Sequence, residues 1–152
     1  MGHFVTGLIA KPNLLGSFAR RHSLHQPVEL AQGLALLPLR DQDIDSILAP
    51  PHTGHADGFT YLSEQLQVEL AAASDDGEIL YFETEYFGGA GAQGAAVFSK
   101  GALVFGPTAA EKGPINEALR MLGVTAGSTR DEFAAVGLDR HRHTEDWLDS
   151  DE

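Results

Sequence analysis

Three extended segments follow one another between residues 79 and 105, and they constrain the fold more than any other feature of the sequence. Residues 79–87, 95–99 and 102–105 are rich in aromatic and aliphatic side chains and are bounded by turn residues. Only Lys100-Gly101 separates the last two segments, and so short a connection is typical of a tight antiparallel hairpin. The sequence therefore predicts an antiparallel sheet at the centre of the fold.

Two further strands and five helices complete the predicted elements of this 152-residue chain, which has the length of one ordinary domain. The further strands are expected at residues 4–9 and 33–39, and the helices at residues 12–19, 41–48, 59–74, 114–122 and 128–136. These elements predict an α+β fold with a mainly antiparallel (mixed) five-stranded sheet and helices packed on one side. Residues 1–138 are expected to form a single globular domain, and residues 139–152 a charged C-terminal tail in which Trp147 docks on the domain.

A glycine-rich motif directly follows the strand at residues 79–87. Gly89, Gly91 and Gly94 satisfy G-x-G-x-x-G, a pattern that in dinucleotide-binding folds lets the backbone approach a pyrophosphate. The context differs here, because the preceding strand carries Glu83 and Glu85 and no crossover helix fits before Lys100-Gly101. We therefore interpret the motif as a connection between antiparallel strands, shaped by the following residues of the loop: Gly88, Gly89, Gly91 and Gln93.

Alternation along residues 80–87 places four side chains on one face of the strand, namely Tyr81, Glu83, Glu85 and Phe87. This face is open to three interpretations. It can be a solvated outer face, it can hold an acid–base pair because neighbouring carboxylates raise each other's pKa, or it can bind a partner. Aromatic rings beside carboxylates supply anchoring area next to charge, which favours partner contacts at these four residues.

Acidic residues dominate the charge of the chain. The sequence has 10 Lys and Arg against 22 Asp and Glu, a formal net charge of -12. Residues 41–99 contain eleven acids, including Asp75 and Asp76, and no Lys or Arg. This balance argues against sequence-independent nucleic-acid binding and against a polybasic membrane anchor. A region in which all charges are negative attracts cationic partners, so Asp75 and Asp76 are further predicted contacts. A contribution of the charge to solubility explains the acidic composition equally well.

Neither cysteine nor histidine chemistry has a recognisable motif in this sequence. There is no cysteine, which excludes disulfides, thiolate catalysis and Cys-based zinc sites. The seven histidines show no strong metal-ligand spacing, so no metal or cofactor is expected, and a role for His52 and His55 in their loop stays open. The sequence also lacks a signal-peptide pattern and a long apolar run, so we expect a cytoplasmic protein.

The segment from Tyr81 to Val97 resembles small bacterial cytosolic proteins in which an aromatic–acidic strand leads into a Gly-Gly-x-Gly-x-Gln turn and a small-residue strand. Some of these are uncharacterised, and others resemble immunity proteins that neutralise secreted toxins. The resemblance covers about 17 of 152 residues. It implies no cofactor, a cytoplasmic location and a dedicated protein partner, and it transfers no catalytic residue.

The function predicted from these observations is that of a non-enzymatic acidic binding protein, an immunity-type inhibitor of a basic protein toxin. This prediction depends on the anions of residues 41–99 gathering into one field. The alternative is a small-molecule-binding protein or enzyme with a pocket at the glycine-rich loop 88–94. Glu83 or Glu85 would then act as base and His52 or His55 as acid. A structural subunit of an oligomer is a third possibility.

Overall fold

The computed structural model describes residues 2–88 and 90–149. Its centre is a seven-stranded sheet in the order β3-β4-β2-β5-β6-β7, with β1 paired to β5, and every pairing is antiparallel. The strands are β1 (Gly2–His3), β2 (Thr6–Ala10), β3 (Val28–Glu29), β4 (Ala35–Pro38), β5 (Ile79–Phe87), β6 (Ala90–Ser99) and β7 (Ala102–Ala110). The α+β class is confirmed, and the predicted count of five strands was too low because the short β1 and β3 carry little sequence signal.

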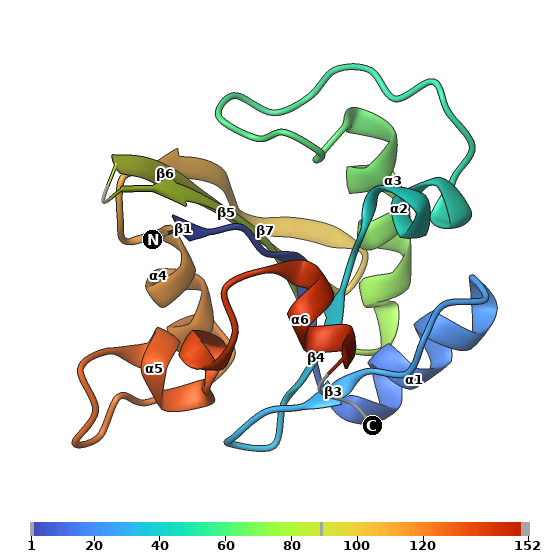
Figure 1. Ribbon diagram of the computed structural model, residues 1–152. Coiled ribbons are helices and arrows are strands. Elements are labelled where there is room, and N and C mark those ends of the chain that lie inside the picture. The colour runs from blue at the N-terminus through green and yellow to red at the C-terminus, as the bar shows by residue number, and fades with distance from the viewer. Residues whose placement is uncertain (1, 89, 150–152) are drawn as a thin grey trace.

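Helices cover both faces of this sheet, so the prediction of helices on one side was wrong (Figure 1). One face packs against α1 (Pro12–Arg21), α2 (Asp41–Ile47) and α3 (Glu64–Ala73). The other face packs against α4 (Pro114–Met121), α5 (Glu132–Val136) and α6 (Thr144–Asp149). Two 3₁₀ turns, η1 (Ser74–Asp76) and η2 (Leu138–Arg140), complete the described elements.

The composition of the inner strands explains the two helical layers. Tyr81 of β5 packs in the first core with α1, α2 and α3, whereas its neighbours Leu80 and Phe82 pack in the second core. In β2, Leu8 and Ile9 divide in the same way. Strands with apolar side chains on both faces must be covered on both faces, because either face left bare would expose a wide apolar surface.

The glycine-rich segment joins two antiparallel strands, as predicted, but β6 begins at Ala90, so Gly91, Gln93 and Gly94 are strand residues and not the loop residues that were expected. Phe87 of β5 lies opposite Ala90 of β6, and β6 continues as a strand in place of the helix that a dinucleotide site requires. Gly88 has a φ of 60° in this turn, and Gly89 lies outside the described residues. At Gly91 a Cβ atom would lie 2.0 Å from the carbonyl oxygen of Glu85, so only glycine fits there.

Several segments differ from their predicted bounds: β7 runs to Ala110 and not to residue 105, and α5 begins at Glu132 and not at residue 128. The helix expected over residues 59–74 begins at Glu64, because the Ser63 hydroxyl caps it by accepting a hydrogen bond from the Leu66 N–H at 3.1 Å. Residues 139–149 include α6, and Trp147 is fully buried in the second core, which confirms that it docks on the domain. No helix among the described residues is both long and apolar enough to cross a bilayer.

Candidate functional site

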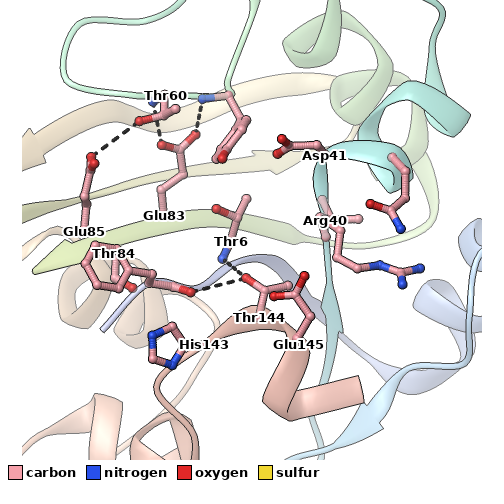
Figure 2. A pocket seen from close by; sticks show the side chains of 14 residues that line it. Thr6, Arg40, Asp41, Thr60, Glu83, Thr84, Glu85, His143, Thr144 and Glu145 are labelled. Atoms are coloured by element: carbon pink, nitrogen blue, oxygen red, sulfur yellow. Dashed lines mark hydrogen bonds between the residues drawn. The ribbon is translucent and has the colours of Figure 1, made fainter. Parts of the chain in front are cut away.

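A polar cavity of about 360 Å³ lies at the end of the sheet where β2 begins and β4 ends (Figure 2). Five chain segments converge on it: β1–β2, the β4–α2 junction, residues 60–61, β5 and the start of α6. We call it the acidic pocket. Its lining residues are Phe4, Thr6, Leu39, Arg40, Asp41, Gln42, Thr60, Tyr61, Glu83, Thr84, Glu85, His143, Thr144 and Glu145.

Glu83 holds the loop wall of the acidic pocket in place. Glu83 is only 7% exposed, and its carboxylate accepts hydrogen bonds from the backbone N–H groups of Thr60 at 2.7 Å, Tyr61 at 2.8 Å and Leu62 at 3.1 Å. The buried Tyr81 hydroxyl donates a fourth hydrogen bond at 2.5 Å. Burial, followed by the charge of Glu83, raises the pKa of Tyr81 well above its usual range, so this hydroxyl stays a donor. Residues 60–62 are therefore fixed to β5 and cannot extend α3.

The pKa of Tyr61 indicates a negative electrostatic potential in the acidic pocket. Burial is the largest cause that raises the pKa of Tyr61, and the charges of Asp41, Glu83 and Glu85 raise it further. Three carboxylates from two distant segments therefore act on one phenol. Figure 2 shows the Asp41 carboxylate pointing into the pocket and Glu85 reaching towards Thr60, whose hydroxyl donates to it at 3.5 Å.

The positive charge at the pocket is largely neutralised by other acids. Arg40 makes a bidentate contact with Asp43, with Nε–Oδ2 and Nη2–Oδ1 distances of 2.9 and 3.0 Å. Burial alone would raise the pKa of Asp43, but its hydrogen bonds with Arg40 and the charge of Arg40 hold that pKa below its usual value. The distance between His143 Nδ1 and Asp146 Oδ2 is 3.5 Å. Among the described residues, Asp41, Glu85 and Glu145 form no ion pair, so the pocket keeps unneutralised negative charge.

The structure divides the predicted partner contacts among three places. Glu85 lines the acidic pocket, and Phe87 is 76% exposed two residues further along β5. Tyr81 is buried beneath the pocket, where a partner on the surface cannot reach it, and Glu83 is largely buried but lines the pocket. Asp75 and Asp76 lie at the opposite end of the sheet, in a second cavity, so the anions of residues 41–99 do not form one field.

The loop-shaping residues serve the hairpin and its attachment. Gln93 accepts a hydrogen bond from the Ile115 N–H at 2.8 Å and donates to the Tyr86 hydroxyl at 3.1 Å, which ties β6 to the start of α4. Gly88 and Gly91 do not line any of the three cavities described for this chain. This placement gives no support to a ligand site at the loop 88–94.

The histidines considered as acids lie away from the acidic pocket. His52 Nε2 is 2.9 Å from Asp45 Oδ1, and neither His52 nor His55 lines the pocket. Within residues 2–88 and 90–149, no three His, Asp or Glu side chains are grouped so that they could share a metal ion. The side chains of the pocket are instead suited to accept hydrogen bonds from an ammonium or guanidinium group.

Sequence reasoning missed part of this site. Asp41 was counted among the acids but not as a site residue, and Tyr61 was placed in a helix. Glu145 and Thr144 were assigned to the tail, although the Thr144 hydroxyl accepts a hydrogen bond from the Thr6 N–H at 3.2 Å. The start of α6 could have been recognised from Thr144 followed by two acids, a pattern typical of a helix N-terminus. Comparisons with family models, curated proteins and solved structures found no match.

Proposed function

We propose that this chain is a non-enzymatic binding protein for a basic protein partner, and that the acidic pocket receives a lysine or arginine side chain of that partner. The observation that carries the proposal is the convergence of Asp41, Glu85 and Glu145 on one cavity whose lining arginine, Arg40, is paired with Asp43. A cation in this cavity would gain charge-assisted hydrogen bonds from carboxylates and from the surrounding hydroxyl groups.

The surroundings of the pocket fit a protein partner better than a free ion. Phe87 lies on the same face of β5 as Glu85 and exposes most of its ring, and an exposed aromatic ring beside a charged recess is a frequent anchor of protein interfaces. The formal net charge of -12 would also accelerate the approach of a basic protein at low salt.

An inhibitor of a basic toxin is the form of this proposal that the resemblance of residues 81–97 to immunity proteins supports. In that case the chain acts by covering the basic surface of the toxin, and it needs neither a cofactor nor a catalytic residue. A cytoplasmic location is part of the same proposal.

The test is an NMR titration with N-acetyl-lysine methylamide, which presents a single lysine side chain. We expect saturable shifts at the amides of Thr60, Tyr61, Glu85 and Glu145. The triple substitution Asp41→Asn, Glu85→Gln and Glu145→Gln should weaken binding by at least about tenfold, because it removes the three unpaired carboxylates.

The matched control removes three carboxylates at the other end of the sheet, with Asp75→Asn, Asp76→Asn and Glu78→Gln. Both triple variants change the net charge equally, so only the location differs. Equal loss in both variants, or shifts spread over the whole surface, would show that the lysine probe senses net charge and not the pocket.

A further inference from the structure

A larger cavity of about 650 Å³ lies at the opposite end of the sheet, where β2 and β6 end and β4 and β5 begin. We call it the mixed-charge cavity. Figure 1 shows α1 and the end of α3 lying side by side at this end of the molecule. Apolar side chains from both cores line the cavity, namely Leu14, Phe18, Leu34, Ala73 and Leu122.

Charges of both signs surround this apolar lining. The cations are Lys11 just before α1, Arg21 at the end of α1 and Lys100 in the β6–β7 turn. The acids all come from one short segment, with Asp75, Asp76 and Glu78. All six are exposed, and among the described residues none of them forms an ion pair. Opposite charges therefore share one cavity without neutralising each other.

The wall that carries Lys100 and Asp75 is fixed by the buried Ser74. The Ser74 carbonyl oxygen accepts a hydrogen bond from the Lys100 N–H, and its hydroxyl accepts one from the Gly101 N–H, both at 3.0 Å. Lys100 has a φ of 53°, in the left-handed region where Asn or Gly is the usual choice for a hairpin turn. The turn is thus held against η1, and its position relative to the acids does not depend on a ligand.

From this arrangement we infer that the mixed-charge cavity binds a short zwitterionic peptide with apolar side chains. The carboxylate of the peptide would contact the cations, its ammonium group would contact the acids of residues 75–78, and its side chains would cover the apolar lining. Charge complementarity carries this assignment, because a ligand of one sign would leave three like charges unmatched. The volume lies in the range typical of small-molecule sites.

The experiment is a calorimetric and NMR titration of the full chain with the peptide Leu-Leu-Leu. We expect saturable binding with a dissociation constant of about 1 mM or tighter, and shifts at the amides of Gly77, Ser99 and Leu122. N-acetylated and C-amidated forms of the peptide should each bind at least about tenfold more weakly, because each lacks one of the two charges.

Two charge variants separate the two ends of the peptide. With Lys11→Gln, Arg21→Gln and Lys100→Gln, the chain should no longer distinguish the free from the amidated C-terminus. With Asp75→Asn, Asp76→Asn and Glu78→Gln, it should no longer distinguish the free from the acetylated N-terminus. These side chains are exposed, so folding should be preserved, and the amide spectrum of each variant verifies it.

A control with Asp41→Asn and Glu85→Gln, in the acidic pocket, should leave trileucine binding unchanged. The inference is overturned if trileucine shows no saturable binding at several times the expected constant. It is equally overturned if the blocked peptides bind as well as the free one, or if the shifts map to the acidic pocket.

Discussion

The two cavities at the ends of the sheet are both lined by acidic and basic side chains. They differ in whether these charged groups are bonded to other groups of the protein. In the acidic pocket, Glu83 accepts four hydrogen bonds and Arg40 is bonded to Asp43, so two of the charged groups maintain the structure. In the mixed-charge cavity, all six charged groups are exposed and unpaired within the described residues.

The comparison shows that the acids of residues 41–99 lie at separate places in the fold. Asp41, Glu83 and Glu85 belong to one end of the sheet, and Asp75 and Asp76 belong to the other. Substitutions of the bonded groups Glu83 and Arg40 at the first end should therefore change stability, whereas substitutions at the second end should change binding alone.

The largest effect is expected for Trp147→Ala. This side chain is fully buried in the second core, and α6 carries Thr144 and Glu145 of the acidic pocket. Loss of a buried tryptophan should lower the free energy of unfolding by about 4 kcal/mol, measured by urea denaturation. Val68→Ala, at a position 65% exposed, should stay within about 0.5 kcal/mol of the wild type. A small effect of Trp147→Ala would show that α6 is not an integral wall of the pocket.

Glu83→Gln should follow, with a loss of about 3 kcal/mol, because one of the two acceptor oxygens becomes an N–H₂ group that faces at least one backbone N–H donor, and the negative charge that strengthens the remaining hydrogen bonds is lost. Tyr81→Phe removes a single donor and should cost about 1 kcal/mol. Asp76→Asn, at the other end, should change stability by less than about 0.5 kcal/mol. Equal effects of Glu83→Gln and Asp76→Asn would remove the distinction between the two ends.

Substitutions of Arg40 and Arg21 compare the contribution of one cation at each end of the sheet to stability. Arg40→Met leaves Asp43, which is 4% exposed, without its bidentate partner, and should cost about 2 kcal/mol, a value reduced because the Arg40 side chain is itself partly exposed. Arg21→Met removes an exposed cation without an ion pair among the described residues and should cost less than about 0.5 kcal/mol. Thermal denaturation of the two variants measures both effects, and the opposite ranking would contradict this account.

The smallest effect concerns pH. Burial lowers the pKa of His3 below its usual value of 6.5, with further lowering by Arg142 and His143 and opposing contributions from the Leu138 backbone and Asp139. The folded state then binds fewer protons than the unfolded state just below pH 6.5, so stability should fall as the pH falls through this window. His3 Nδ1 lies 2.7 Å from the Thr84 hydroxyl of the acidic pocket. His3→Gln should cost less at low pH than at neutral pH, as urea denaturation across the pH range would show; a pH-independent cost would contradict the assignment.

Local patterns were sufficient to predict five of the seven described strands and five of the six described α-helices, although not all of their bounds. Residues 79–87 form a strand, and Lys100-Gly101 forms a turn. Both structures are determined by a few neighbouring residues. The second helical layer was missed, because alternation along β5 was given more weight than the continuous apolar character of β2 and β4. The acidic pocket could not be predicted, because its acids come from positions more than 100 residues apart. Asp41 and Glu85 meet through the pairing of β2 with β4 and β5, and Glu145 joins them because the segment at the start of α6 is hydrogen-bonded to Phe4. In the sequence, Glu83 resembles a surface acid. Its hydrogen-bond donors include the N–H groups of Thr60 and Tyr61, and the helical spacing of residues 59–74 wrongly assigned these two residues to a helix.

The most direct test of the central claim is the association rate of a fluorescent lysine-rich peptide with the two triple variants, measured by stopped flow over a range of salt concentrations. We predict that neutralising Asp41, Glu85 and Glu145 slows association and flattens its salt dependence far more than neutralising Asp75, Asp76 and Glu78 does. Identical rates and salt slopes for the two variants would contradict the claim that this protein engages cations through one end of its sheet.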